Sequence, residues 1–387
     1  MKSKIAHAVS SIPLSGIREM MKRAATYDNV ISLGIGEPDF GTAKEICEQA
    51  FRDAVGGATH YTQSQGDPEL VEAIQAYLRK RFGEDFSSRQ IVVTTGGIGG
   101  LSSFFRTVLN PDDEVLLPEP YFPPYRHLIE WVGGKATPVH TSFENGFMPT
   151  REALEKAITP STKALLLNSP NNPTGAVIPA ETLDGIARIA VERDLLVLSD
   201  EVYDRLLFDG LTHESIWTRP GMRERTVVVQ SFSKSFAMTG WRIGYAFGPE
   251  WIIESMIKVV TSYTSCAPSV SQRAALAALR LDGKFIDTMV DEFRARRDLA
   301  YEALKGLPGV RVHRPAGTFY IFPDMSQITK NSLQFAVDLL QDEQVMVVPG
   351  ETFGPSGMGC LRLALTVNEG RLEEALQRIQ RFIHTHY

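Results

Sequence analysis

The chain has 387 residues, of which 43% are hydrophobic and 22% charged, enough for one large domain with a smaller companion. No apolar run approaches the ~20 residues that a membrane-spanning helix needs, so a membrane protein is not expected. The 46 acidic and 40 basic residues give a net charge of -6, and the basic residues are dispersed. This distribution argues against a nucleic-acid surface and favours a small-molecule substrate.

The three cysteines, Cys47, Cys266 and Cys360, lie far apart and form no Cys-x-x-Cys pair. Neither a disulfide framework nor a metal site is therefore expected. The basic N-terminus is followed by Ser10, Ser11 and Pro13 rather than by an apolar stretch, so no secretory signal is expected either. These observations predict a cytoplasmic protein.

In chain order, residues 1–45 are rich in turn signals and are predicted to form an arm that crosses to a C-terminal domain. Residues 46–280 alternate short apolar runs with longer helical patterns, as expected for a large domain with a mostly parallel sheet covered by helices. The predicted strands are 91–94, 114–117, 164–167, 195–198 and 226–229. Residues 281–387 change to a long charged helix followed by short strands, which predicts a smaller α+β domain.

A polar motif begins where each apolar run stops, which is where an open α/β sheet builds its ligand site. After the first run, the glycines of 95–101 allow close backbone approach, and the helix that follows offers free N–H groups to a phosphate. A plain helix-capping loop is the alternative. Ser102 replaces the last glycine of a G-x-G-x-x-G motif, so a dinucleotide site is not favoured.

The next three motifs offer an aromatic ring, side-chain amides and a carboxylate. In 119–125, one ring could stack on a planar heterocycle, although core packing would also explain the aromatics. A rigid turn at 168–175 presents amides, and Asp200 and Tyr203 follow the fourth run. A carboxylate against a ring nitrogen keeps that nitrogen protonated and makes the ring an electron sink. A helix N-cap is the alternative role for Asp200.

The fifth motif, 231–244, surrounds Lys234 with hydroxyls and an arginine. A lysine amine becomes useful in catalysis when its surroundings lower its pKa or when a carbonyl cofactor captures it. A solvated lysine in a polar loop is the alternative, since short motifs often match by accident.

Arg362 alternates with apolar neighbours, so a strand should aim its guanidinium into the space between the domains, where it suits a carboxylate. A surface salt bridge is the competing interpretation.

The motifs 171–175, 200–203 and 231–244, in this order and spacing, resemble the class I/II aminotransferases of pyridoxal phosphate fold type I. The resemblance covers nearly the whole chain and includes 33–40, which is similar to the family's N-terminal substrate segment. It is strongest for the prokaryotic branch of aromatic and broad-range enzymes. The resemblance implies a mostly parallel sheet of the seven-stranded type, and it implies pyridoxal 5'-phosphate as the cofactor.

By resemblance, Lys234 would form the internal aldimine and shuttle a proton, and Asp200 would bind the pyridinium nitrogen. Asn172 and Tyr203 would contact the phenolic oxygen, and Phe122 would stack on the ring. The groups implied for the phosphate are Gly97, Ile98, Ser231, Ser233 and Arg242, together with Tyr61 from the neighbouring subunit of a homodimer with shared active sites. Arg362, Asn172 and the Gly36 amide would hold the substrate carboxylate.

Aspartate-preferring relatives carry a further basic residue for the second carboxylate, but 96–100 contains no lysine and 261–266 no arginine. Strict dicarboxylate specificity is therefore not expected. Ile35, Tyr263, Phe319 and Tyr320 suggest a pocket for aromatic or other neutral side chains, with 2-oxoglutarate as the amino acceptor.

Three other functions remain open. Ser231 and Lys234 match the Ser-x-x-Lys of penicillin-recognising acylases, but the partner motifs Ser-Asp-Asn and Lys-Thr-Gly are absent. A C–S lyase or another eliminating enzyme could use the same cofactor and much the same residues. A non-catalytic regulator on this fold is the third alternative, and the presence of Lys234 argues against it.

Overall fold

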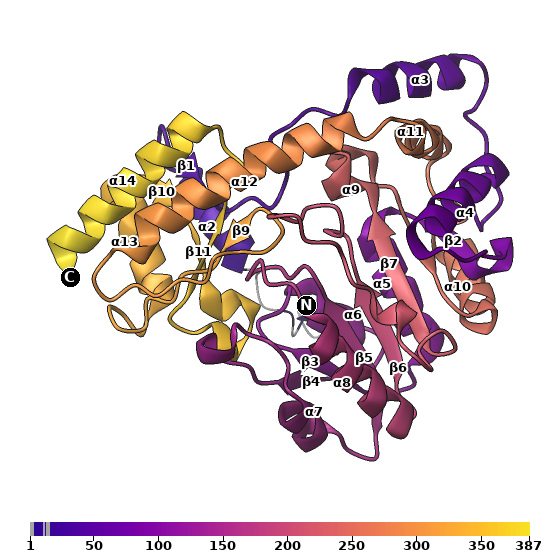
Figure 1. Cartoon of the computed structure of the whole chain (residues 1–387), viewed down its shortest axis with the longest axis horizontal. Coiled ribbons are helices and arrows are strands. Elements are labelled where there is room, and N and C mark those ends of the chain that lie inside the picture. Colours follow the sequence, from indigo (N-terminus) through magenta and orange to yellow (C-terminus); the bar gives the residue numbers. More distant parts are fainter. Residues whose placement is uncertain (1–3, 11, 13–15) are drawn as a thin grey trace.

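A computed structural model describes residues 4–10, 12 and 16–387. Within them, seven strands form one sheet in the order β2-β8-β7-β6-β5-β3-β4 (Figure 1). The strands are β2 (Ile91–Thr94), β3 (Glu114–Pro118), β4 (Lys135–Val139), β5 (Thr162–Asn168), β6 (Leu196–Asp200), β7 (Thr226–Ser231) and β8 (Gly244–Phe247). β8 runs antiparallel to β2 and β7, and every other pairing in this sheet is parallel. The predicted α/β class and the predicted strands are confirmed.

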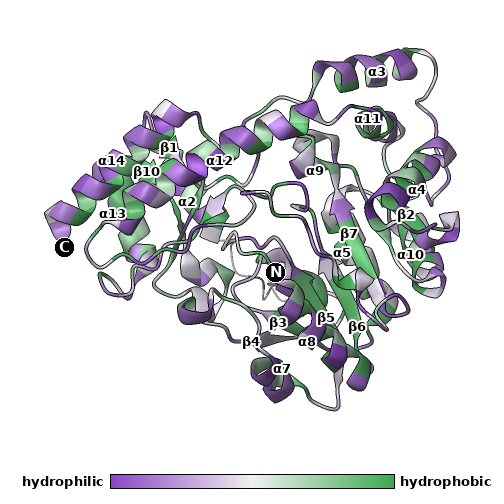
Figure 2. Ribbon diagram, in the orientation of Figure 1, coloured by the Kyte–Doolittle hydropathy of each residue, from purple (hydrophilic) through white to green (hydrophobic). Residues whose placement is uncertain are grey.

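Helices cover both faces of this sheet, which explains the continuous apolar runs of its strands. Val92 and Leu166 pack with the helices on one face, whereas Val93 and Leu165 pack with those on the other. The helices of this region are α3 (Lys44–Val55), α4 (Pro68–Phe82), α5 (Gly96–Val108), α6 (Pro124–Glu130), α7 (Arg151–Ala157), α8 (Ala180–Glu192), α9 (Phe232–Ser235), α10 (Glu250–Thr264) and α11 (Ser269–Leu279). Figure 2 shows the apolar strands enclosed by helices with hydrophilic outer faces.

The rest of the described chain builds a smaller α+β assembly. β11 (Val348–Pro349), β12 (Leu361–Ala364) and β9 (Tyr320–Ile321) form an antiparallel sheet, and β1 (Ile31–Ser32) pairs in parallel with β10 (Val345–Met346). Its helices are α2 (Gly16–Ala24), α12 (Lys284–Lys305), α13 (Ser332–Glu343) and α14 (Glu369–His386), and a short helix, α1 (His7–Ser10), precedes α2 in the chain.

Chain segments from both ends share the core of this smaller assembly. Met20, Ile31 and Leu33 pack against Leu339 and Leu376, so the N-terminal segment lies beside the C-terminal helices (Figure 1). This packing agrees with the expected N-terminal arm, while the domain boundaries at 1–45, 46–280 and 281–387 stay a prediction. No helix in the described ranges is long and apolar enough to cross a membrane.

The carboxyl ends of the central strands meet at one edge of the large sheet. Asp200 lies opposite Asn168 in β5 and opposite Val229 in β7. Gly244 brings the loop after β2 to the same place, because a Cβ there would lie 2.6 Å from the Gln230 oxygen and 2.9 Å from the Gly96 carbonyl carbon. Only glycine permits this approach. The polar motifs therefore converge at this edge.

Candidate active site

A cleft of about 480 Å³ lies at this edge, between the strand ends and the smaller assembly. It is lined by Ile17, Ile35, Gly36, Glu37, Gly97, Ile98, Leu101, Phe122, Pro124, Tyr125, Asn172, Asp200, Val202, Tyr203, Ser231, Ser233, Lys234, Thr239, Arg242, Tyr320 and Arg362. The predicted site residues line it, except for Tyr61, Tyr263 and Phe319. Tyr263 is 68% exposed on α10 and Phe319 is buried in the core, so neither lines the cleft of its own chain, contrary to the prediction of the substrate pocket. The Tyr61 side chain is 88% exposed and lies outside the cleft of its own chain.

Lys234 lies in α9, directly after β7, and its side chain is half-buried. Its Nζ donates a 2.6 Å hydrogen bond to the Gly36 carbonyl. Burial lowers the pKa of Lys234 from 10.5 to about 8, because a desolvated ammonium is costly. The Glu37 and Asp200 charges oppose this change, whereas those of Arg362 and Arg242 favour it. An amine with this pKa exists partly in its neutral form near pH 8.

Asp200 is buried at the end of β6. Its Oδ2 accepts a 2.7 Å hydrogen bond from the Tyr125 hydroxyl, and its Oδ1 accepts one of 3.3 Å from the Val202 amide. Burial raises the pKa of Asp200 to about 6, and these two donors oppose the rise. The helix N-cap role considered for Asp200 is wrong, since a turn at 202–205 follows β6 and the next helix begins at Ile216.

Two phenols meet beside the cleft. The hydroxyls of Tyr203 and Tyr320 lie 3.1 Å apart, and both rings are buried. Burial raises the pKa of Tyr203 well above its usual value of 10, so this phenol is protonated at neutral pH. Gly36 permits the arrangement, because a Cβ at that position would lie 2.1 Å from the Tyr320 hydroxyl oxygen.

Arg362 lies on β12 and is 1% exposed. Its Nη2 donates to the Gly34 carbonyl at 2.6 Å and its Nη1 to Asn172 Oδ1 at 3.1 Å, while the Tyr320 and Phe353 rings lie 4.6 Å and 5.0 Å from its guanidinium carbon. The buried Nε has no partner among the described residues, and the guanidinium donates to a carbonyl and a side-chain amide rather than to a carboxylate. The surface salt bridge considered above is therefore wrong. A buried, unpaired guanidinium suits an anionic ligand.

The opposite end of the cleft gathers groups that bind anions. Gly97 and Ile98 are in the first turn of α5, which has thirteen residues, so their amides point toward the cleft without helical partners. The Ser231 hydroxyl accepts a 3.1 Å bond from the Ser233 amide. The Arg242 guanidinium lies against Gly96 and donates to the Thr239 carbonyl at 3.0 Å. Its acceptor is a carbonyl rather than a carboxylate, which leaves the charge of Arg242 for a ligand.

Phe122 also lines the cleft. Its ring meets the Tyr125 ring edge to face, with centroids 5.5 Å apart and an interplanar angle of 81°. The contact with Tyr125 covers one side of the Phe122 ring at most, and the other side can meet a planar ligand in the cleft.

Sequence reasoning missed several residues that line the cleft. Tyr125 belongs to the 119–125 motif but was given no role, and its partner Asp200 lies too far along the chain to be visible in the local pattern. Ile17, Leu101 and Glu37 also line the cleft, and Glu37 accepts a hydrogen bond from Thr239. Ile17 carries no local signal, since the packing of α2 on the C-terminal core decides its place.

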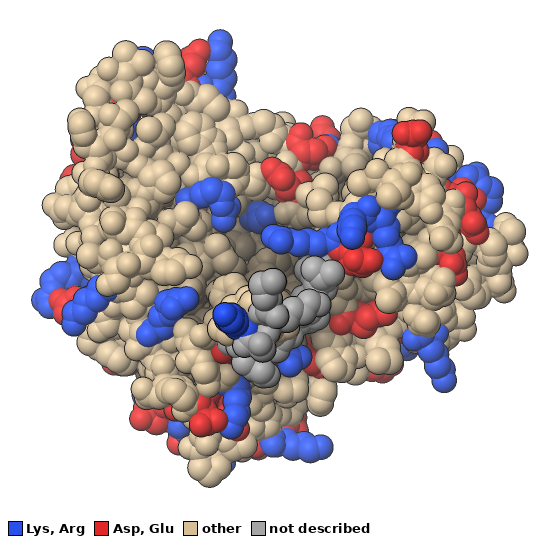
Figure 3. Space-filling model, turned by 180° about the vertical axis from the view of Figure 1, so that it is seen from behind, with Lys and Arg blue, Asp and Glu red and all other residues tan. Residues whose placement is uncertain are grey.

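The distribution of surface charge is a weaker indication of a ligand site than the cleft is. Figure 3 shows acidic and basic side chains across one face of the molecule, with several basic side chains beside its central hollow.

Comparisons with known proteins agree with this geometry. Residues 28–379 match the family model for aminotransferase class I and II. A putative aminotransferase, YugH, of Bacillus subtilis is 42% identical over 99% of both chains. The aromatic-amino-acid aminotransferase 2 of Thermococcus litoralis is 40% identical over 95% of each. The crystal structure of the aspartate aminotransferase of Rhizobium meliloti superposes with a TM-score of 0.95 at 34% identity, covering 98% of this chain and 99% of the other. The chain therefore belongs to the aminotransferase class I and II family of enzymes.

Proposed function

We propose that this protein uses pyridoxal 5'-phosphate to move the amino group of an L-amino acid with an aromatic or other neutral side chain to a 2-oxo acid, with 2-oxoglutarate as the acceptor. The observation that carries the proposal is one cleft that holds three groups: the Lys234 amine, the buried Asp200 carboxylate and the buried, unpaired Arg362. The Lys234 amine matches the aldehyde of the cofactor, the Asp200 carboxylate matches its ring nitrogen, and Arg362 matches the carboxylate of the substrate.

The donor set of the cleft fits this cofactor. The free amides of Gly97 and Ile98 and the unpaired Arg242 suit its phosphate, with Ser231 and Ser233 beside them. Phe122 offers a ring face to the pyridine ring. Because the Asn172 oxygen accepts from Arg362, its amide group remains a donor for the phenolic oxygen, alongside the Tyr203 phenol. When bound, pyridoxal 5'-phosphate supplies an aldehyde and an electron-withdrawing ring that stabilises negative charge on the substrate α-carbon.

Each of the three central residues has a chemical task. Asp200, in its ionised form, keeps the neighbouring ring nitrogen protonated. Arg362 and Asn172 fix the substrate carboxylate and so orient the bond from the α-carbon to its hydrogen. Lys234 Nζ, with a pKa of about 8, is neutral often enough to accept the α-proton and return it. The Gly36 carbonyl orients this nitrogen.

The charges of the cleft favour a neutral amino acid. Lys234, Arg242 and Arg362 are its cations among the described residues, and each already has a task. Apolar side chains from Ile17, Ile35 and other lining residues would contact the substrate side chain. Relatives named for both aromatic amino acids and aspartate were found, so the relatives do not decide between these substrates. A strong preference for aspartate in steady-state assays would contradict this part of the proposal.

The working form is a homodimer with shared active sites, located in the cytoplasm. Tyr61 supports the dimer, because its exposed phenol cannot serve the cleft of its own chain but could reach the phosphate in a second copy. Phe51 and Val55 on α3 are 70% and 74% exposed and offer apolar surface for that contact. Light scattering after gel filtration should give a dimer mass, and a monomer would contradict the shared site.

The half-reactions can be followed in one spectrum. Protein loaded with pyridoxal 5'-phosphate should absorb near ~360–430 nm, lose that band with phenylalanine, and regain it with 2-oxoglutarate. Lys234→Ala should abolish turnover while retaining some bound cofactor. Release of pyruvate and ammonia, without the reversible change in absorbance, would instead indicate the C–S lyase. That alternative is not favoured, because the relatives described above are named aminotransferases.

A further inference from the structure

Tyr125 is a buried tyrosine whose hydroxyl is directed at Asp200. It lies in the first turn of α6, is 1% exposed, and donates the 2.7 Å hydrogen bond to Asp200 Oδ2. Burial raises the pKa of this phenol well above 10, so the hydroxyl remains a donor throughout the working pH range. The bond thus runs from a permanent donor to a carboxylate.

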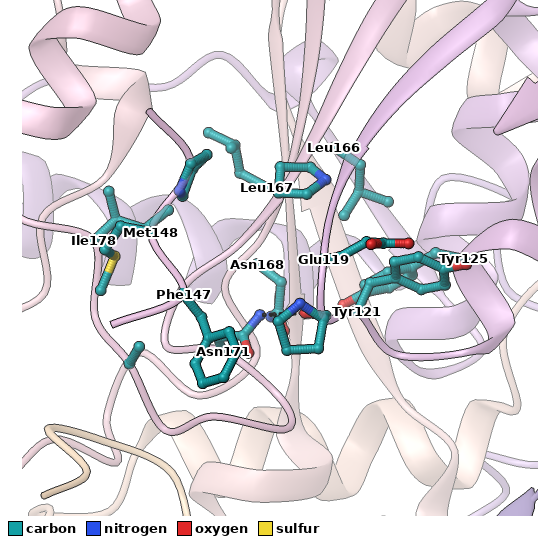
Figure 4. A pocket seen from close by; sticks show the side chains of 14 residues that line it. Glu119, Tyr121, Tyr125, Phe147, Met148, Leu166, Leu167, Asn168, Asn171 and Ile178 are labelled. Carbon is teal, nitrogen blue, oxygen red and sulfur yellow. Dashed lines mark hydrogen bonds between the residues drawn. The ribbon is translucent and has the colours of Figure 1, made fainter. Parts of the chain in front are cut away.

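The Tyr125 ring also forms the wall between two cavities. It lines the cleft on one side, and on the other a small cavity of about 30 Å³ whose lining includes Glu119, Tyr121 and Asn171 (Figure 4). A volume this small holds one or two water molecules at most. Tyr125 is therefore held on one side by its contact with Phe122, and the small cavity on the other side leaves little room for the ring to move. Its hydroxyl has little freedom to turn away from Asp200.

The ionisation of Asp200 depends on few neighbours. Burial and the Glu201 charge favour the neutral acid, whereas Tyr125, the Val202 amide and the Lys234 charge favour the carboxylate. The Tyr203 phenol also lies near and stays neutral at working pH. With a pKa of about 6, Asp200 is close to taking up a proton under ordinary conditions. Loss of one donor is enough to change its charge state near neutral pH.

We propose that Tyr125 is a positioning residue that acts through Asp200: its hydroxyl holds the carboxylate ionised and aimed into the cleft, ready for the ring nitrogen of the cofactor. The proposal rests on the function proposed above. The hydrogen bond contributes to cofactor affinity only at pH values at which Asp200 would be protonated without it. At higher pH the carboxylate is ionised in any case, and the bond is then present both with and without cofactor, so its loss does not change the affinity. A merely structural tyrosine would affect affinity equally at every pH.

The test is the affinity for pyridoxal 5'-phosphate as a function of pH. Full-length wild type, Tyr125→Phe and the control Tyr121→Phe are stripped of cofactor and titrated with it between pH 5.0 and pH 8.5. Tyr121 is a matched control, since it also lines the small cavity but its phenol faces Arg126 rather than Asp200. Loss of this hydrogen bond should raise the pKa of Asp200 by about one unit. Tyr125→Phe should therefore bind the cofactor about tenfold more weakly than wild type at pH 5.0 and as tightly as wild type at pH 8.5.

Each outcome is decisive. A difference that closes as the pH rises, with Tyr121→Phe equal to wild type, supports the proposal. A difference that is the same at every pH, or no difference, overturns it while leaving the proposed function intact. Failure of the wild type itself to bind pyridoxal 5'-phosphate overturns the proposed function and the role of Tyr125 with it. Thermal melts of the cofactor-free variants check that each remains folded.

Discussion

Replacing Lys234 with methionine should make the cofactor-free protein more stable at neutral pH. The substitution keeps the length of the side chain and removes a charge that is held in a partly desolvated place. The unfolded chain holds the ammonium in water, where its pKa is near 10.5. The folded chain therefore spends free energy to keep Lys234 protonated below pH 8.

The magnitude follows from the two pKa values. The fall from 10.5 to about 8 corresponds to a ceiling of about 3 kcal/mol at pH 7, at 1.36 kcal/mol for each pKa unit. Partial exposure of the side chain reduces this figure, and loss of the bond to the Gly36 carbonyl removes about 1 kcal/mol more. A net gain of about 1 kcal/mol in the free energy of unfolding is expected.

Urea unfolding of the cofactor-free proteins at a series of pH values measures this gain. Between pH 8 and pH 10.5 the folded wild type binds fewer protons than its unfolded chain, so wild type gains stability as the pH rises and the advantage of Lys234→Met should shrink. Lys80→Met, at an exposed position on α4, is the control and should change stability by less than about 0.5 kcal/mol. A variant less stable than wild type at pH 7, or an advantage that does not depend on pH, would refute the reasoning.

Three further substitutions test the cleft and its support. Gly36→Ala would drive a methyl group into the Tyr320 hydroxyl, so we expect at least about tenfold lower kcat/KM and a stability loss of about 1–3 kcal/mol, read from kinetics and melting. Arg362→Met should lower kcat/KM at least about 30-fold for every amino acid tested, because the α-carboxylate is common to all; an effect confined to one substrate would contradict its assignment. Arg273 joins α11 to Asp53 on α3 at 2.9 Å. Burial raises the pKa of Asp53, but hydrogen bonds, including the one from Arg273, lower it below its usual value overall. The ion pair therefore stabilises the folded protein above about pH 4, and this stabilisation is lost as the pH falls. Arg273→Met should accordingly cost about 1 kcal/mol at pH 7 and less at pH 3 in urea titrations, and an equal cost at both would exclude the ion pair.

The strands that sequence reasoning predicted are those buried on both faces. β7 is apolar or β-branched over most of its length because helices cover each side, and such a run is visible without any structure. β4 escaped prediction because Lys135 and Pro138 make it look like a loop, and as an edge strand it tolerates both. β8 escaped because it has only four residues and begins at Gly244, where the polar motif 231–244 ends.

The candidate site was predictable to the extent that its chemistry lies next to strand ends. Asp200, Lys234 and the start of α5 all follow apolar runs, and parallel strands bring such positions together. The partners of these groups were not predictable in the same way. Tyr125 reaches Asp200 from 75 residues away, and Ile17 reaches the cleft through a helix packed on another core. Contacts of this kind depend on tertiary packing rather than on local pattern.

The antiparallel strand β8 has a consequence for how the protein is made. β2 and β7 are not neighbours in the sheet, because β8 lies between them and pairs with both. During synthesis, a nascent chain that ends before residue 244 exposes an open edge on each of these strands, and open edges invite pairing with other chains. The groups after β2 and β7 can meet only once 244–247 have emerged from the ribosome and inserted. The cleft at this edge of the sheet is therefore completed late in synthesis, and the earlier intermediate is the species with the open strand edges.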